Sequence, residues 1–346
     1  MSSYTEASVP MCVNWHVTET CNYGCKHCFA KWGKQREVWN DPDQVEYIIA
    51  GIANHVKTTA MIPKRFRLNI VGGEPILQPE KLWNVVKTAK KYGAEVSIIT
   101  NGSHLENIRP FAHLISQVGI SIDSLDHETN MKIGRECCGK TICFEALRQK
   151  IEDLRKVNPD IKIKLNTVVN SLNFNEVLVE RFAELRIDKW KILRQRPFNG
   201  NPGISDFQFY AFIRNNYNES LMQANVLKRH TELPLSFLVN ECYGEDQETK
   251  QVIYIEDKDA MTESYLMISP DGRLFQNSSE EYTYSRPLTE VSFAAALSDI
   301  KFDSAKFESR YATWPTQSTV NEMEYYFHVI EDDYDDYDCF MEFGDD

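Results

Sequence analysis

The sequence has no long apolar run, no secretion signal and no excess of basic residues, and each absence excludes a class of protein. No stretch approaches the roughly 18 apolar residues of a membrane span, so no membrane is expected as a partner. The first residues, Met1 to Glu6, lack the basic and apolar regions of a signal peptide, so a cytoplasmic location is expected. With 38 basic residues against 51 acidic ones, no nucleic-acid partner is expected either.

The net charge of −13 is concentrated at one end of the chain. Residues 315–346 hold 11 acids and no Lys or Arg, whereas the other 314 residues carry 40 acids and 38 bases. The body is therefore nearly neutral. Aromatic residues are interleaved with the acids of this last segment, which we interpret as an acidic aromatic tail that is at least partly disordered.

The nine cysteines do not form a disulfide framework, because their number is odd and the chain is large. Three of them fall within eight residues, as Cys21-x-x-x-Cys25-x-x-Cys28. Three thiolates on one short loop can bind three irons of a four-iron, four-sulfur cluster and leave the fourth iron open. A zinc site assisted by His16 or His27 is the alternative, but no second cysteine pair completes it.

Strand and helix patterns alternate along the first 200 residues. An Asp-Pro pair at position 41 predicts a helix start, and apolar residues at helical spacing follow it. Six such units predict an α/β fold with a parallel sheet, a partial (β/α)6 barrel whose chemistry lies at the carboxyl ends of the strands. The six strands are expected at 12–18, 66–71, 95–100, 117–123, 161–169 and 190–196.

Two motifs at successive strand ends resemble those of the radical S-adenosylmethionine (radical SAM) enzymes. The first is the cysteine motif followed by Phe29, and the second is Gly72-Gly73-Glu74-Pro75. The resemblance implies a [4Fe-4S] cluster on Cys21, Cys25 and Cys28, S-adenosylmethionine chelated to its open iron, and a 5′-deoxyadenosyl radical. Glycines at a strand end allow the backbone to approach a ligand closely, and the resemblance assigns this loop to the methionine amino group.

Further segments between Val13 and Trp314 resemble the viperin-type nucleotide dehydratases, above all residues 121–135. The resemblance implies conversion of a nucleoside triphosphate to its 3′-deoxy-3′,4′-didehydro form, a chain terminator in antiviral or antiphage defence. It also implies an electron donor such as flavodoxin or ferredoxin. It divides the chain into a barrel at 1–200, a segment completing the nucleotide site at 201–314, and the tail.

The resemblance also assigns site residues. To S-adenosylmethionine it assigns Gly72, Gly73, Glu74, Asn101, Ser121 near the ribose, Arg135 at the carboxylate, and Asn166. Asn101 has the alternative role of capping the next helix. To the triphosphate it assigns Lys164 and Lys191, with Arg194 and Arg310 as further candidates, and to hydrogen donation Tyr265. A packing role is the alternative for Tyr265.

Two other functions remain open at this point. One is a radical enzyme acting on a peptide or small molecule, although only Cys242 and Cys339 follow Cys143, too few for auxiliary clusters. The other is a non-catalytic iron–sulfur nucleotide sensor, against which the complete cysteine and glycine motifs argue. The nucleobase and the oligomeric state are not predicted.

Overall fold

The computed structural model describes most of the barrel and part of the C-terminal region. The described residues are 10–30, 33, 36–59, 64–197, 200, 202–216, 253–256, 262–276 and 282–307. The predictions for Arg310 and for the tail at 315–346 lie outside them. No helix of the described residues is long and apolar enough to cross a membrane.

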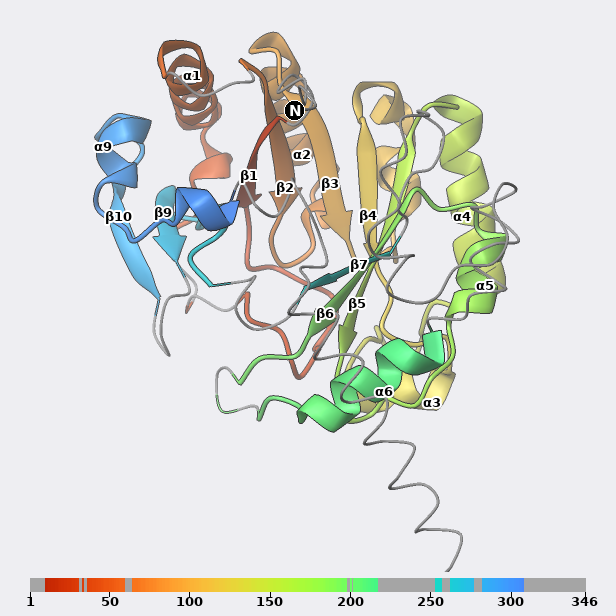
Figure 1. The fold of residues 1–346 in the computed structure, drawn as a ribbon. Coiled ribbons are helices and arrows are strands. Elements are labelled where there is room, and N and C mark those ends of the chain that lie inside the picture. Colours follow the sequence, from red (N-terminus) through yellow and green to blue (C-terminus); the bar gives the residue numbers. More distant parts are fainter. Residues whose placement is uncertain are drawn as a thin grey trace, which may run out of the picture.

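In the part of the chain that the structure describes, ten strands form one open sheet, in the order β10-β9-β8-β1-β2-β3-β4-β5-β6-β7 (Figure 1). Strands β1 to β6 are parallel neighbours, with β7 parallel to β6 at one edge and β8 parallel to β1 towards the other. Because β10 and β7 end the sheet without pairing to each other, the predicted partial barrel is confirmed. The strands are β1 Met11–His16, β2 Phe66–Val71, β3 Glu95–Thr100, β4 Gln117–Ser121, β5 Lys162–Val169, β6 Lys189–Arg194, β7 Ile253–Glu256, β8 Leu266–Ile268, β9 Arg273–Gln276 and β10 Thr283–Pro287.

Helices cover the outer side of the curved sheet (Figure 1). Helix α1 (Pro42–Thr58) begins as predicted, with the Asp41 carboxylate accepting from the Asp43 N–H at 3.0 Å and Pro42 in the first turn. Its apolar stripe, from Val45 to Val56, is buried. The other helices are η1 Val38–Asn40, η2 Pro75–Leu77, α2 Pro79–Lys91, η3 Leu105–Leu114, α3 His127–Ile133, α4 Phe144–Val157, α5 Val179–Glu184, α6 Asp206–Asn216 and α9 Phe293–Leu297.

Alternation along the strands separates an apolar outer face from a more polar inner face. On β6, Trp190 is buried and packs edge-on against Phe182 of α5, with ring centroids 4.9 Å apart. Trp190 therefore marks the outer face, and Lys189 and Lys191 lie on the inner one. Since the six strands are parallel, their carboxyl ends meet at one edge, where the cysteine loop and the glycine loop follow β1 and β2.

Candidate active site

The cysteine loop follows β1 and carries three free thiols, with Cys21 exposed and Cys25 and Cys28 half-buried. Burial raises the pKa of Cys25 to about 12 and also raises that of Cys21, so a bound iron must displace their protons. Among the described residues, there is no group of three or more His, Cys, Asp or Glu side chains placed to bind a single metal ion. Cluster thiolates bind different irons and need not converge, so the donor set fits a cluster.

The glycine loop after β2 packs directly on the backbone that leads into the cysteine loop. The Gly73 N–H donates to the Thr18 carbonyl at 2.6 Å, and the Glu74 N–H donates to the Thr20 carbonyl at 2.7 Å. A Cβ on Gly72 would lie 2.6 Å from the Thr18 oxygen, and one on Gly73 would lie 2.4 Å from the Thr20 oxygen. Both glycines are therefore required by the approach of two backbones, in addition to any contact with a cofactor.

Glu74 is buried and links the ends of β2 and β3. Its carboxylate accepts from the Ile76 N–H at 3.2 Å and from the Asn101 N–H at 2.6 Å. Burial raises its pKa to about 7, although these hydrogen bonds oppose the shift. The described contacts of Glu74 thus hold two strand ends together beside the cysteine loop.

Replacing Glu74 with glutamine is expected to change how stability depends on pH. Because the pKa of Glu74 is near 7 in the folded chain and near 4.5 in the unfolded chain, the folded state holds its proton more tightly. The parent should therefore lose stability, on the order of 3 kcal/mol, as the pH rises from about 4.5 to 7. Thermal unfolding of both proteins across this range measures the difference. Parallel pH profiles would contradict the assignment.

Asn101 holds the cysteine loop from the end of β3. Its side-chain N–H donates to the Asn22 amide oxygen at 2.8 Å and lies 4.0 Å from Cys21 Sγ. Its own amide oxygen accepts from the Ser103 N–H at 2.9 Å, which is a local turn contact. Asn22 in turn donates to the Ser103 hydroxyl at 3.1 Å. The N-cap position of the next helix, η3, is His104, so Asn101 contacts the cysteine loop and does not cap that helix.

The other side of the cysteine loop rests on the end of helix α3, a contact that was not predicted. The Gly24 N–H donates to the Gly134 carbonyl at 3.1 Å, and the Lys26 N–H donates to the Ile133 carbonyl at 2.9 Å. Gly134 has a left-handed φ of 86°, and a Cβ there would lie 2.4 Å from the Gly24 oxygen. A glycine just after a helical pattern signals a helix end, but not its partner in the fold.

Arg135 follows Gly134 directly and is buried beside the cysteine loop. Its Nε donates to Oδ2 of Asp123, a fully buried carboxylate at the end of β4. His27, which lies between the second and third cysteines, places Nε2 3.2 Å from the same oxygen. Burial lowers the pKa of His27, although the nearby Asp123 carboxylate opposes the shift. His27 thus faces a carboxylate here, and Asp123 is a site residue that was missed.

Three of the predicted site residues lie in one row across neighbouring strands. In the strand register Ser121 of β4 pairs with Asn166 of β5, which pairs with Lys191 of β6. The side-chain nitrogen of Asn166 is buried and has no hydrogen-bond partner among the described residues. An unsatisfied buried donor is costly, and a bound polar ligand would satisfy it. The unsatisfied N–H of Asn166 is therefore consistent with S-adenosylmethionine binding beside this row.

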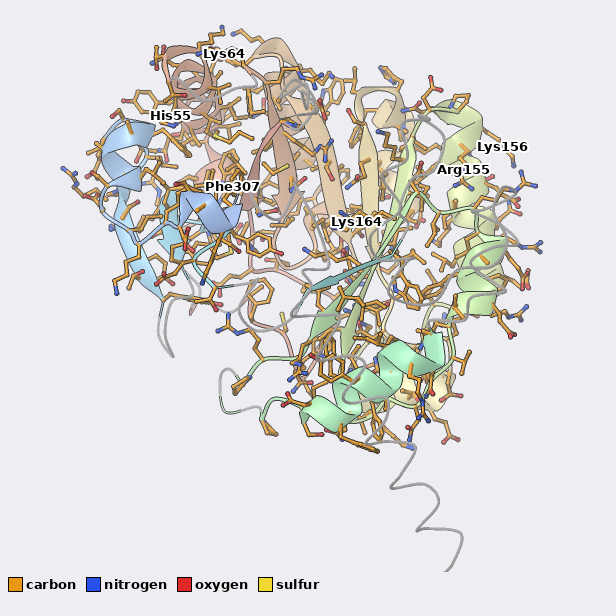
Figure 2. All side chains as sticks on the ribbon, viewed as in Figure 1. His55, Lys64, Arg155, Lys156, Lys164 and Phe307 are labelled. Carbon is orange, nitrogen blue, oxygen red and sulfur yellow. The ribbon has the colours of Figure 1, made fainter. Side chains whose placement is uncertain are left out.

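Lys164 lies two residues before Asn166 on the same face of β5. Figure 2 shows it over the middle of the sheet, whereas Arg155 and Lys156 belong to the outer helix α4. Lys162, at the start of the strand, is exposed as expected. Lys164 therefore lies on the inner face next to the row that contains Lys191, and Lys189 of β6 pairs with it in the strand register.

Lys191 and Tyr265 are in direct contact. The Lys191 ammonium donates to the Tyr265 hydroxyl at 2.6 Å and lies 5.1 Å from the centre of its ring. Tyr265 directly precedes β8, so the contact spans the inner face from β6 to a strand on the far side of β1. The predicted hydrogen donor and a predicted phosphate ligand thus belong to one arrangement.

The structure does not bring Arg194 to this inner face. Arg194 lies three residues after Lys191 on β6, and an odd spacing turns a side chain to the opposite face. Its guanidinium pairs with Asp206 and stacks on Phe209 and Tyr210 of α6, with its central carbon 4.5 and 5.6 Å from the ring centres. We therefore leave Arg194 out of the substrate site.

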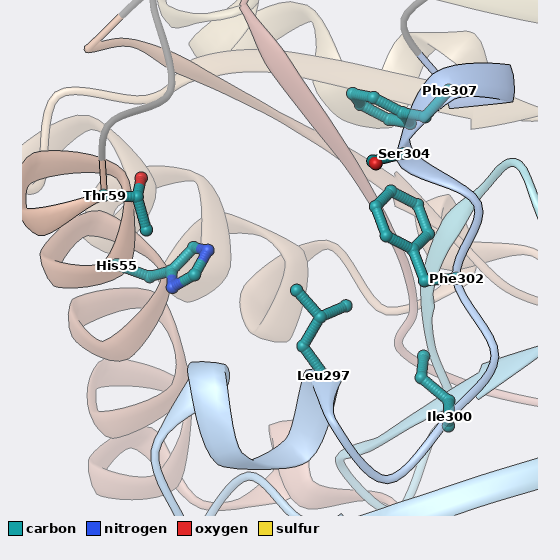
Figure 3. A pocket seen from close by; sticks show the side chains of 7 residues that line it. All are labelled: His55, Thr59, Leu297, Ile300, Phe302, Ser304 and Phe307. Atoms are coloured by element: carbon teal, nitrogen blue, oxygen red, sulfur yellow. The ribbon is translucent and has the colours of Figure 1, made fainter.

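A cavity of about 460 Å³ lies elsewhere, between α1 and the segment around α9 (Figure 3). Its lining contains none of the predicted site residues. It is lined by His55, Thr59, Leu297, Ile300, Phe302, Ser304 and Phe307. Since its lining is mainly apolar and holds no cysteine, it is not the site of the predicted chemistry.

Comparisons with known proteins show which superfamily this chain resembles. The sequence profile of the Radical SAM superfamily matches residues 15–185. The chain is 54% identical to an S-adenosylmethionine-dependent nucleotide dehydratase of Fibrobacter sp. (strain UWH6), over 96% of this chain and 97% of the relative. It is 38% identical to an enzyme of the same name from Psychrobacter lutiphocae, over 88% and 96%.

Among solved structures, native anSMEcpe with bound AdoMet and the Kp18Cys peptide has a similar fold. Its TM-score is 0.59 at 15% identity, over 86% of this chain and 84% of that one. This likeness confirms the fold. The superfamily profile and the close relatives confirm the [4Fe-4S] cluster and S-adenosylmethionine as cofactors. The chain belongs to the S-adenosylmethionine-dependent nucleotide dehydratases of the radical SAM superfamily.

Proposed function

We propose that this chain converts a nucleoside triphosphate to its 3′-deoxy-3′,4′-didehydro analogue, a chain terminator for defence against viruses or phage. The single observation that carries this proposal is the polar row of Ser121, Asn166 and Lys191 on the inner face, at the strand ends that bear the cysteine loop. Its relatives are named nucleotide dehydratases, which supports a nucleotide as substrate. A cytoplasmic location stays a prediction from the sequence.

The residues around the row divide between cofactor and substrate. Cys21, Cys25 and Cys28 would hold the cluster, and the terminal nitrogens of Arg135 would bind the methionine carboxylate. When bound, the cluster and S-adenosylmethionine supply a 5′-deoxyadenosyl radical that can remove the ribose 4′ hydrogen. Asn166 would donate its unsatisfied N–H to the ligand, as its burial requires.

The substrate side needs positive charge, because a triphosphate brings several negative charges into the barrel. Lys164 and Lys191 supply it from neighbouring strands. The 4′ radical loses its 3′ hydroxyl as water, which requires one proton for the hydroxyl and one electron to close the 3′,4′ double bond. Tyr265 would give both as one hydrogen atom and would then be restored by the electron donor. Lys191, which donates to the phenol oxygen, would hold the ring in place. Two electrons are consumed per turnover, and a flavodoxin or ferredoxin would supply them.

Anaerobic incubation with S-adenosylmethionine, dithionite and each ribonucleoside triphosphate in turn tests this function. We expect 5′-deoxyadenosine to rise with at least one nucleotide, together with a product lighter than that nucleotide by one water. If none of the nucleotides raised the amount of 5′-deoxyadenosine, the proposal would fail.

Replacing Lys191 with methionine is expected to weaken nucleotide binding while leaving cofactor binding intact. A charged hydrogen bond to phosphate contributes about 1.5–3 kcal/mol, so KM for the nucleotide should rise by about 10-fold or more. Lys162→Met is the matched control, because Lys162 is exposed at the strand start and should leave KM unchanged. Equal KM values for both variants would contradict the role of Lys191.

A further inference from the structure

A fully buried carboxylate, Asp123, lies where three parts of the site meet. Its Oδ2 accepts from Arg135 Nε and lies 3.2 Å from His27 Nε2 of the cysteine loop. Its Oδ1 accepts from the Val168 N–H of β5 at 2.8 Å. The exposed fraction of the Asp123 side chain is 0%. One residue therefore contacts the cysteine loop, the arginine beside it and the strand that bears Asn166.

We propose that Asp123 is a positioning residue that holds Arg135 in the orientation that binds the carboxylate of S-adenosylmethionine, and fixes the cysteine loop to the same point through His27. The proposal rests on the role assigned above to Arg135. It adds a residue that does not touch the cofactor and acts through one that does.

The geometry of the guanidinium supports this role. Arg135 uses Nε for Asp123, and its two terminal nitrogens form no hydrogen bond with a described residue. These two nitrogens form the fork that matches a carboxylate with two parallel hydrogen bonds. Because Asp123 is held by the backbone of β5 at its other oxygen, it cannot turn with the arginine. The direction of the fork is therefore fixed by the sheet.

Charge balance gives Asp123 a second effect. Arg135 is largely buried, and a buried cation without a partner is strongly unfavourable. Asp123 neutralises it before any cofactor binds. The contact through His27 then couples the position of the arginine to the segment between Cys25 and Cys28. A shift of Arg135 or of this segment would change the distance between the terminal guanidinium nitrogens and the cluster.

A double-mutant cycle on the cluster-loaded enzyme separates positioning from general stability. The dissociation constant of S-adenosylmethionine is measured without nucleotide, by calorimetry and by the change it causes in the electron paramagnetic resonance signal of the reduced cluster. The variants are Asp123→Asn, Arg135→Gln and the double variant, with Asp153→Asn on helix α4 as a half-buried control outside the site.

We expect Asp123→Asn and Arg135→Gln each to weaken binding by about 10- to 100-fold, with iron content retained. The double variant should bind within about 3-fold of Arg135→Gln, because the contact with His27 serves to place the arginine relative to the cysteine loop and has no effect on the cofactor once the arginine is gone. Losses that multiply in the double variant, or a normal dissociation constant for Asp123→Asn, would overturn the proposal.

Asp123→Glu covers the case in which the asparagine variant does not fold. It keeps the charge, so it should fold and load its cluster, but the extra methylene displaces the fork and should still weaken binding. Unchanged affinity in this variant would also overturn the proposal. Since no nucleotide is present, these results are independent of whether the dehydration proposed above occurs.

Discussion

Replacing Cys25 with alanine is expected to abolish cleavage of S-adenosylmethionine. A cluster held by three thiolates loses a third of its protein ligands, and no other thiol of the described residues lies within the loop. Iron and sulfide content should fall well below the parent value, and 5′-deoxyadenosine should be absent under anaerobic reducing conditions. Both are measured on protein reconstituted in parallel with the parent.

Cys143→Ala is the matched control for this experiment. Cys143 is exposed at the start of α4 and makes no side-chain capping hydrogen bond. Its loss should leave iron content and turnover unchanged. A Cys25→Ala protein with a full cluster and normal 5′-deoxyadenosine would show that the cysteine loop does not hold the cluster.

Replacing Gly73 with alanine should have the next largest effect. The added Cβ would lie 2.4 Å from the Thr20 oxygen and 2.5 Å from the Glu19 oxygen, both of them backbone atoms. The loop can accept it only by moving, which would lengthen the hydrogen bond from Gly73 to Thr18. We expect a loss of stability of about 1–3 kcal/mol and a fall in turnover of at least 100-fold, because the cysteine loop moves too.

Gly51→Ala controls for the change of residue type. Gly51 lies within α1, and a Cβ there would meet no atom within 4 Å. Alanine at an open helical position should stabilise the protein by roughly 0.5–1 kcal/mol. Thermal unfolding and turnover of the two variants, measured side by side, test the difference. Equal behaviour would mean that close packing of the two loops does not shape the site.

The elements that depend on local pattern were predictable from the sequence. Apolar periodicity and the proline after Asp41 predicted the first helix, and the alternation of strands and helices predicted an open parallel sheet. The cysteine and glycine motifs were expected at neighbouring strand ends, and the pairing of β1 with β2 brings them together. Each of these features follows from residues that are near one another in the chain.

Features that depend on contacts across the sheet were not predictable in this way. Asp123 has no motif of its own, and its role follows only when β4, β5 and the cysteine loop meet. Gly134 signals a helix end, yet its partner lies 110 residues earlier, at Gly24. Arg194 is different, since its odd spacing from Lys191 already places the two on opposite faces. The spacing of these two residues in the sequence is enough to exclude Arg194 from the inner face.

The fold alone does not choose among radical enzymes. A solved structure with a similar fold holds a peptide, but at 15% identity it carries no argument about the substrate of this chain. The lysines of the inner face and the names of the close relatives favour a nucleotide. An experiment that follows an atom from the ribose therefore tests the account more directly than one that follows the cofactor.

Deuterium at the 4′ position of the ribose provides that test. With the nucleoside triphosphate that stimulates turnover, the account predicts one deuterium in the 5′-deoxyadenosine released, and a nucleotide product that has lost the 4′ deuterium and the 3′ hydroxyl. Unlabelled 5′-deoxyadenosine formed at the normal rate, with the nucleotide recovered unchanged, would contradict it.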